Sequence, residues 1–316
     1  MKRIFIAGHN GMVGSAVRRS ADLYPQEYEL ITESRENLDL INSKAVDSFI
    51  KKNQPDCVVI AAAKVGGIVA NSSQPADFIY DNIMIQTNLM KASMKYDVGQ
   101  VLFLGSSCIY PKECPQPIKE EYLLSDYLEK TNESYAIAKI AGLKMCEAFN
   151  KQFKTDFRSL MPTNLYGAND NFDDLTSHVI PGLMNRMHYA KLNNDSEVVV
   201  WGSGKPMREF LYVDDLAEVI LEVMSIKRDI FFSKLPDNSS HLNVGYGKDI
   251  SIADLSELIK EVVGFRGEII FDKSKPDGTQ RKLLDTSILN SFEIYPKTNL
   301  RDGLSKTYQF YLKSKN

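Results

Sequence analysis

Residues 2–14 read KRIFIAGHNGMVG, and this stretch decides the fold. Its first six residues predict a short buried strand, and glycines at positions 8, 11 and 14 precede a helical run to about Leu23. In a dinucleotide-binding unit, such glycines let the chain turn sharply after the strand and leave the N-terminus of the helix facing a pyrophosphate. A glycine triplet alone is weak evidence, so its position directly after the first strand carries the prediction.

The rest of the N-terminal half alternates between strand and helix patterns. Strands are predicted at 28–32, 56–63, 100–104 and 157–161, with helices at 43–52, 76–96 and 133–152. This alternation is typical of α/β proteins with a doubly wound parallel (Rossmann) sheet, whose ligands bind beyond the carboxyl ends of the strands. After about residue 165 the alternation ends. We therefore predict a dinucleotide-binding domain over 1–165, rejoined by a segment near 211–226, and a smaller α/β lobe over 166–316 that mainly binds the substrate.

Composition argues against several classes of protein. The 316 residues carry a net charge of −3, which gives no basic surface of the kind that binds nucleic acid or an anionic membrane. We expect a cytoplasmic protein, because no apolar run reaches the roughly 18–20 residues of a membrane span and the N-terminus lacks a secretion signal. Cys57, Cys108, Cys114 and Cys146 form no CxxC pair, which predicts free thiols and no metal site.

The segment SYAIAK, residues 134–139, is the strongest indication of chemistry. Tyr135 and Lys139 stand four positions apart in a helical pattern, so their side chains leave the same face of the helix. An adjacent ammonium favours the phenolate, which predicts a lowered pKa for Tyr135. Such a pair suits acid–base chemistry on an alcohol or a carbonyl.

Two residues after the second predicted strand bear on the choice of cofactor. The Glu33 carboxylate can accept from a ribose 2′-hydroxyl, which favours NAD, whereas Arg35 can pair with a 2′-phosphate, which favours NADP. These residues alone leave both cofactors open.

Six further segments complete the pattern: AKVGGI (63–68), GSSCIYP (105–111), MPTNLYG (161–167), SHVIP (177–181), VWGSG (200–204) and MREFL (207–211). Together with the glycine loop and SYAIAK, they resemble the extended short-chain dehydrogenase/reductases that act on nucleotide sugars, and among these most closely the GDP-L-fucose synthases. The resemblance covers essentially the whole chain. It implies NADP(H)-dependent reduction of the C4 ketone of a GDP-4-keto-6-deoxy sugar, together with 3,5-epimerisation.

The resemblance implies two sets of catalytic residues. Ser106, Tyr135 and Lys139 match the hydride-transfer triad of the family, in which the tyrosine protonates the new alkoxide, the serine bonds the same oxygen and the lysine holds the ribose. Cys108 and His178 match its epimerisation pair, which removes and returns protons next to the ketone.

The resemblance also implies which residues bind ligands. At NADP(H), with NAD(H) as the alternative, it places Gly8, Asn10, Gly11, Met12, Val13, Gly14, Arg35, Asp39, Leu40, Ala62, Ala63, Lys64, Leu104, Gly105, Tyr135, Lys139, Pro162, Asn164, Leu165 and His178. At the GDP-linked keto sugar it places Ser107, Asn164, Arg186, Trp201, Arg208, Asp277 and Lys282. It further implies a homodimer formed through the helices at 76–96 and 133–152.

Two departures from the family pattern leave alternatives open. Asn10 stands where the glycine loop usually carries an arginine for the 2′-phosphate, which weakens the expectation of NADP. Ala168 and Asn169 replace a proline–histidine pair beside the sugar site, so the substrate can instead be a GDP-4-keto-heptose that is reduced without epimerisation. A nucleotide-sugar 4-epimerase is a further enzymatic alternative, and a dinucleotide-sensing protein without turnover is the non-enzymatic one.

Overall fold

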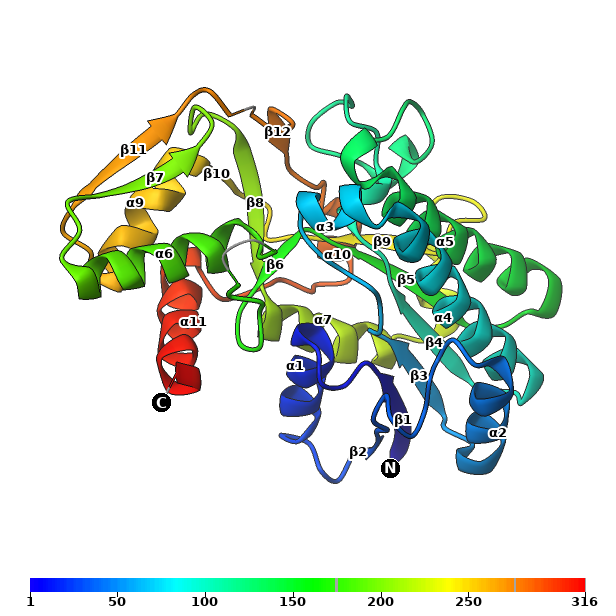
Figure 1. Cartoon of the computed structure of the whole chain (residues 1–316). Coiled ribbons are helices and arrows are strands. Elements are labelled where there is room, and N and C mark those ends of the chain that lie inside the picture. Colours follow the sequence, from blue (N-terminus) through cyan, green and yellow to red (C-terminus); the bar gives the residue numbers. More distant parts are fainter. Residues whose placement is uncertain (174–175, 276, 316) are drawn as a thin grey trace.

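The large sheet of the computed structural model is parallel throughout its described strands (Figure 1). The structure describes residues 1–173, 176–275 and 277–315. The strands of this sheet, in spatial order, are β2 (Tyr28–Ile31), β1 (Lys2–Ala7), β3 (Cys57–Ile60), β4 (Gln100–Leu104), β5 (Phe157–Pro162) and β9 (His241–Val244). The order reverses between β1 and β3, where ligands bind in doubly wound folds. The predicted fold class is confirmed.

Helices cover both faces of this sheet (Figure 1). On one face lie α1 (Met12–Ala21) and α7 (Val213–Ser225), and on the other lie α2 (Ser43–Asn53), α4 (Pro75–Lys95) and α5 (Glu133–Phe153). Because successive strand residues point to opposite faces, Ile4 and Ile6 join the first core whereas Phe5 joins the second. This double burial explains why the strands read as continuous apolar runs.

The C-terminal half returns to the large sheet twice. The predicted return near 211–226 corresponds to α7, while β9 adds the sixth strand from a stretch that the sequence analysis placed in the smaller lobe. Two short helices, α8 (Arg228–Ser233) and α10 (Ser287–Ser291), also contribute residues to the first core of the large sheet. The strand was missed because His241 and Asn243 interrupt its apolar pattern. Both are buried but hydrogen-bonded: the Asn243 amide donates to the Ile118 carbonyl at 2.9 Å, and the His241 ring contacts the Glu120 carbonyl at 3.2 Å.

The smaller lobe is built around β8 (Met207–Tyr212). This strand pairs in parallel with β6 (Asn164–Tyr166) and β12 (Arg281–Lys282), and antiparallel with β10 (Asp249–Ser251). A separate pair joins β7 (Glu197–Trp201) to β11 (Glu268–Asp272), and the lobe's helices are α6 (Val179–Asn193), α9 (Ile252–Val263) and α11 (Leu300–Lys315). Apolar residues of these elements form a third core. Because β6 follows β5 almost directly, the chain passes from the carboxyl end of the large sheet straight into the smaller lobe.

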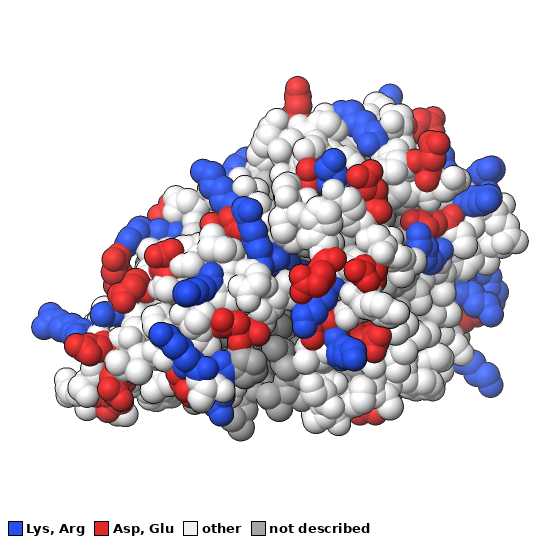
Figure 2. Space-filling model, turned by 90° about the horizontal axis from the view of Figure 1, so that it is seen from above, with Lys and Arg blue, Asp and Glu red and all other residues white. Residues whose placement is uncertain are grey.

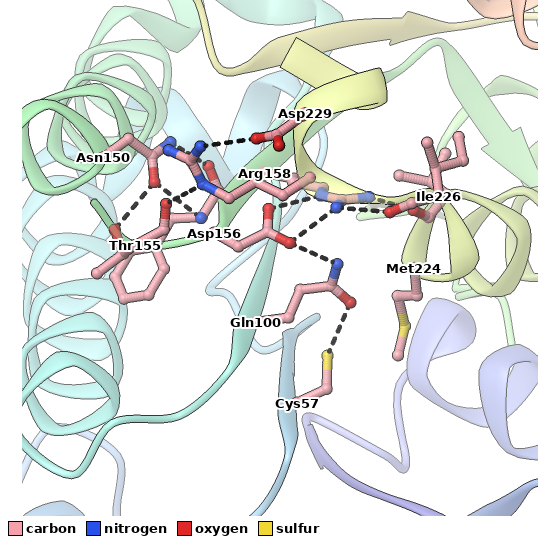
Figure 3. A network of polar contacts seen from close by, with 12 residues as sticks. Cys57, Gln100, Asn150, Thr155, Asp156, Arg158, Met224, Ile226 and Asp229 are labelled. Atoms are coloured by element: carbon pink, nitrogen blue, oxygen red, sulfur yellow. Dashed lines mark hydrogen bonds and ion pairs between the residues drawn. The ribbon is translucent and has the colours of Figure 1, made fainter.

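A buried ionic network lies at the amino-terminal end of β5, away from the strand ends where ligands bind (Figure 3). Arg158 in β5 is fully buried, and its Nε and Nη2 atoms each lie 2.7 Å from the Asp156 carboxylate. The same guanidinium donates to the Val223 and Ile226 carbonyls at the C-terminal end of α7. A buried charge is tolerated only when it is paired and hydrogen-bonded in this way. The network therefore anchors α7 to β5.

Charges of both signs are spread over the surface. On the face shown in Figure 2, Lys and Arg side chains alternate with Asp and Glu. Among the helices of the described residues, none combines the length and apolar character that crossing a bilayer requires.

Candidate active site

The glycine loop brings β1, β3 and α1 together. Gly8 has φ +87°, and a Cβ at this position would lie 2.6 Å from the Ala62 backbone nitrogen. A Cβ on Gly14 would collide with the Gly8 carbonyl oxygen. Only glycine permits both approaches, because it accepts a positive φ and occupies no side-chain volume. The N-terminus of α1, capped by the backbone of Gly11, therefore opens at the point where the strand order reverses.

The loop after β2 separates the roles of Glu33 and Arg35. One Glu33 carboxylate oxygen accepts the Ser34 amide at 3.0 Å and the Asn37 side-chain amide at 2.9 Å. These hydrogen bonds lower the pKa of Glu33 and hold the carboxylate on its own turn. The Arg35 side chain is exposed. The contacts favour Arg35 over Glu33 as the group that meets the adenosine ribose.

The segment after β3 is held by Asn82 of α4. The Lys64 amide donates to the Asn82 side-chain oxygen at 2.9 Å, and the Asn82 amide donates to the Lys64 carbonyl at 3.0 Å. The Lys64 ammonium lies 2.9 Å from the Asp77 carboxylate. Thus α4 engages the ammonium of Lys64 and fixes its backbone at the carboxyl edge of the sheet. The sequence analysis did not identify Asn82, since an asparagine within a helix gives no local signal.

Ser106, Tyr135 and Lys139 come together from two elements at the end of β4. Ser106 precedes the short 3₁₀ helix η1 (Ser107–Ile109), and its Oγ accepts the Cys108 amide at 3.2 Å and hydrogen-bonds the Tyr135 hydroxyl. Lys139 is buried on α5, where its Nζ lies 5.8 Å from the centroid of the Tyr135 ring. It donates to the Leu104 carbonyl at 2.8 Å. The hydroxyls of Ser106 and Tyr135 can therefore bond one substrate oxygen together.

The expected effect of Lys139 on Tyr135 is wrong for this structure. Loss of water around the phenol raises the pKa of Tyr135, with the nearby Cys108 adding to the rise and the Ser106 hydrogen bond opposing it. Burial lowers the pKa of Lys139 to about 7, so the cation that was to stabilise the phenolate is itself disfavoured. Desolvation penalises the charged form of each group and is the largest cause of both shifts. A phenol that stays protonated is suited to donate a proton to an alkoxide.

Cys108 lies between this triad and the smaller lobe. Its Sγ is 3.8 Å from Nζ of Lys282 in β12, a residue 174 positions away in the chain. Lys282 is paired in register with Arg208 of β8, which places two basic residues side by side at the edge of the smaller lobe. Burial lowers the pKa of Arg208, and the Asp277 carboxylate opposes that effect.

Glu209 is a structural carboxylate that sequence analysis did not identify. It is fully buried in β8 and accepts the backbone amides of Gly247 at 2.7 Å and Leu284 at 3.1 Å. Burial raises its pKa. By holding Leu284, Glu209 fixes the chain that follows Lys282. Its position inside the MREFL segment was the available signal, but the partner amides are far away in the sequence.

Three of the residues predicted to bind the nucleotide sugar lie at or near β7. Asp277 accepts the Ser203 amide at 2.8 Å and its hydroxyl at 2.7 Å, and it acts electrostatically on Arg208. Trp201, at the end of β7, is 65% exposed. Arg186 of α6 donates to the Val199 carbonyl at 2.9 Å, which places it against the same strand. Asp277 therefore links the segment after β7 to Arg208, whose strand neighbour Lys282 contacts Cys108.

His178 and the remaining predicted residues lie at the strand ends. His178 is the residue before α6, and the preceding Thr176 carbonyl accepts the Gly67 amide at 3.3 Å, close to the β3 loop. The His178 side chain is exposed, yet the protein around it desolvates the imidazole enough to lower its pKa. Asn164 donates to the Glu209 carbonyl at 2.8 Å. The others stand at the glycine loop and start of α1 (Asn10, Met12, Val13), before α2 (Asp39, Leu40), after β3 and β4 (Ala63, Gly105, Ser107), at the end of β5 (Pro162) and in β6 (Leu165).

Comparison with known protein families identifies the family to which this chain belongs. Residues 4–233 match the NAD dependent epimerase/dehydratase family. The chain belongs to this family. Its membership confirms the resemblance to extended short-chain dehydrogenase/reductases that the sequence motifs indicated.

Individual relatives show which members of the family this epimerase/dehydratase protein is similar to. It is 51% identical over 315 residues to the GDP-L-fucose synthase of Escherichia coli (strain K12), covering 100% of this chain and 98% of that protein. A solved GDP-6-OMe-4-keto-L-xylo-heptose reductase from C. jejuni superimposes with a TM-score of 0.91 at 37% identity, covering 100% of this chain and 98% of that one. A GDP-mannoheptose C4 reductase from Campylobacter jejuni, solved with NADP bound, gives a TM-score of 0.89 at 37% identity and 98% coverage of both chains.

Proposed function

We propose that this protein catalyses NADP(H)-dependent reduction of the C4 ketone of a GDP-linked 4-keto-6-deoxy sugar, together with 3,5-epimerisation. The observation that carries the proposal is the convergence of Ser106, Tyr135 and Cys108 at one strand end, with Lys282 approaching from the other lobe. The 51% identity to a GDP-L-fucose synthase over the whole chain supports this substrate class. Solved relatives that reduce GDP-linked keto sugars, one with NADP bound, support the reaction and the cofactor.

The reduction half requires a proton donor and a hydride donor. NADPH, when bound at the glycine loop and Arg35, supplies the hydride to C4. Tyr135 donates its phenolic proton to the oxygen that gains negative charge, and the raised pKa of Tyr135 keeps that proton available at neutral pH. Ser106 bonds the same oxygen, and Lys139 fixes the end of β4 through the Leu104 carbonyl.

The epimerisation half requires a base and an acid beside the ketone. The C3 and C5 protons are acidic because the enolate that forms on their removal is stabilised by the C4 carbonyl. In the proposed mechanism, Cys108 takes such a proton as a thiolate. His178 returns one, on the proposal that the sugar lies between η1 and the start of α6.

A second candidate is reduction of a GDP-4-keto-heptose without epimerisation. It is favoured by the 37% identity to two solved GDP-heptose reductases and by Ala168 and Asn169. Asn169 adopts φ +62° and donates to the Ser15 hydroxyl of α1 at 2.8 Å. This asparagine therefore ties the segment after β6 to the helix that follows the glycine loop.

One assay separates these functions. The protein is incubated in D₂O with GDP-4-keto-6-deoxymannose or a GDP-4-keto-heptose, the oxidation of NADPH and NADH is followed at 340 nm, and the product is examined by NMR. Consumption of NADPH with deuterium at C3 and C5 of the 6-deoxy sugar is the expected result. Reduction of the heptose alone, without deuterium, would favour the second candidate. Interconversion without net NADPH consumption would indicate a 4-epimerase.

We further propose a homodimer through α4 and α5. These long helices pack on each other, and Tyr80 (58% exposed) and Ile137 (42% exposed) present apolar surface on them. An apolar surface of this kind is typical of helical dimer interfaces. Ile137→Asp should convert a dimer to a monomer in light scattering, whereas Ile230→Asp, at a 49% exposed position on α8, should leave the dimer intact. A monomeric wild-type protein would contradict the proposal.

A further inference from the structure

We propose that Lys282 is a positioning residue for proton abstraction: its ammonium holds Cys108 as the thiolate that acts on the sugar. The catalytic consequence rests on the proposed epimerase-reductase function. The pairing of Lys282 with Cys108 does not, and it can be tested without any substrate.

The first support is the geometry of the contact. The Lys282 Nζ lies 3.8 Å from the Cys108 Sγ, within reach of a hydrogen bond to sulfur. An ammonium beside a thiol favours the thiolate, which is the reactive form of cysteine. Cys114 also lies within the electrostatic reach of Lys282, but burial raises the pKa of its thiol, and the sulfur in contact with Nζ is that of Cys108.

The second support is the way the backbone around Lys282 is held. The two amides that follow it are both bound by side chains: Leu283 donates to Gln116 at 2.9 Å and Leu284 donates to buried Glu209 at 3.1 Å. The Leu283 carbonyl in turn accepts the Ile118 amide at 2.7 Å. A short two-residue strand would not fix a lysine by itself. These contacts fix the backbone from which the Lys282 side chain reaches Cys108 in η1.

The third support is the balance of charge. Within the described part of the chain, no carboxylate forms an ion pair with Lys282 or with its strand neighbour Arg208. The Asp277 carboxylate acts on Arg208 electrostatically, but both its oxygens accept hydrogen bonds from Ser203. Lys282 and Arg208 repel each other as neighbouring cations, and an anion in contact with Lys282 offsets that repulsion. We assign that place to the Cys108 thiolate, whose sulfur is the atom that Nζ contacts.

The proton balance assigns each group one role. The C–H bond next to the ketone breaks and an S–H bond forms on Cys108, while the electron pair moves to the carbonyl oxygen and gives the enolate. Lys282 keeps its proton throughout. Hydride transfer to C4 uses Tyr135 and makes no demand on the thiolate. Loss of Lys282 should therefore impair epimerisation much more than reduction.

The first experiment measures the reactivity of Cys108 in the ligand-free protein. Wild type, Lys282→Gln, Lys282→Arg and the control Lys248→Gln, at an exposed lysine before β10, are alkylated with iodoacetamide, and the Cys108 peptide is followed by mass spectrometry from pH 6 to 10. At pH 7, Lys282→Gln should react at least about tenfold more slowly, while Lys282→Arg and Lys248→Gln stay near wild type. At high pH all variants should approach one alkylation rate. A change in the access of iodoacetamide to Cys108 would instead lower the rate at every pH. Equal rates at pH 7 would overturn the proposal.

The second experiment links the pair to the reaction. At saturating substrate, the exchange of C3 and C5 protons with D₂O is compared with NADPH oxidation on a ketone that is already epimerised. Lys282→Gln should lose at least about tenfold more in exchange than in reduction, and Lys282→Arg should recover exchange. An equal loss in both rates would overturn the assigned role. If wild type turns over no GDP-keto sugar while the alkylation result holds, the proposed function fails and the pairing stands.

Discussion

The ammonium of Lys139 donates to the Leu104 carbonyl at 2.8 Å, which holds it at the end of β4. The lysine of this tyrosine–lysine pair therefore anchors the strand that leads to Ser106, and the raised pKa of Tyr135 keeps the phenol neutral. Through Lys139, the helix that carries Tyr135 is held against the end of the sheet where the cofactor is proposed to bind.

Tyr135→Phe should abolish reduction and leave cofactor affinity nearly intact. The substitution removes the proton donor and keeps the aromatic ring, which packs edge-on against Phe78 with centroids 6.4 Å apart. NADPH oxidation at 340 nm gives the rate, and NADPH fluorescence gives the affinity. Tyr127→Phe, at an 88% exposed position, is the control and should behave as wild type. Full activity of Tyr135→Phe would refute the assignment.

Cys108→Ser should slow the exchange of C3 and C5 protons with D₂O far more than hydride transfer to a pre-epimerised ketone. A serine hydroxyl occupies nearly the same volume but does not ionise near neutral pH, so only the base is lost. NMR follows exchange and absorbance follows reduction. If wild type shows no exchange at all, the reductase-only alternative is correct.

Arg35→Ala should raise the KM for NADPH at least about tenfold and change the KM for NADH little. The exposed guanidinium is proposed to pair with the 2′-phosphate, a charge-assisted contact that NADH lacks. Glu33→Gln is the matched control, since its carboxylate is engaged with Ser34 and Asn37 of its own turn. Steady-state kinetics with both cofactors distinguishes the variants, and an equal loss for NADPH and NADH would contradict the role of Arg35.

Gly8→Ala should destabilise the protein by about 2 kcal/mol or more and weaken NADPH binding. The added Cβ meets the Ala62 backbone at 2.6 Å, and φ +87° is strained for alanine. Gly11→Ala is the control, because its φ is −73° and its added Cβ would lie 3.4 Å from the Gly8 carbonyl. Denaturant unfolding monitors both. Comparable stability of the two variants would exclude the close approach of β1 and β3.

Glu120 should make the free energy of unfolding depend on pH. Burial raises the pKa of Glu120 from 4.5 to about 7, so between these values the unfolded chain loses a proton that the folded protein keeps. Its contribution to stability is therefore complete below about pH 4.5 and falls by about 3 kcal/mol as the pH rises through 7. Glu120→Gln should remove this dependence, and Glu121→Gln, at the exposed neighbouring position, should retain it. Urea unfolding at pH 5 and pH 8 tests the difference, and parallel curves for the two variants would contradict it.

The sequence by itself determined the features that depend on neighbours along the chain. The apolar strand runs, the glycines at 8, 11 and 14, and the spacing of Tyr135 and Lys139 all report local geometry. They predicted the parallel sheet, the turn at the end of β1 and the shared helical face of Tyr135 and Lys139. Local periodicity and turn preference are sufficient for such predictions because they act within a few residues.

Only the tertiary structure decided which distant segments meet and how much water remains around them. The polar residues of β9 hid a strand that is buried because Asn243 and His241 find partners in other segments. The proximity of Lys282 to Cys108 depends on the pairing of β12 with β8, and no spacing in the chain announces it. The pKa of Tyr135 rises because desolvation depends on packing from all sides, whereas the sequence shows only the neighbouring charge.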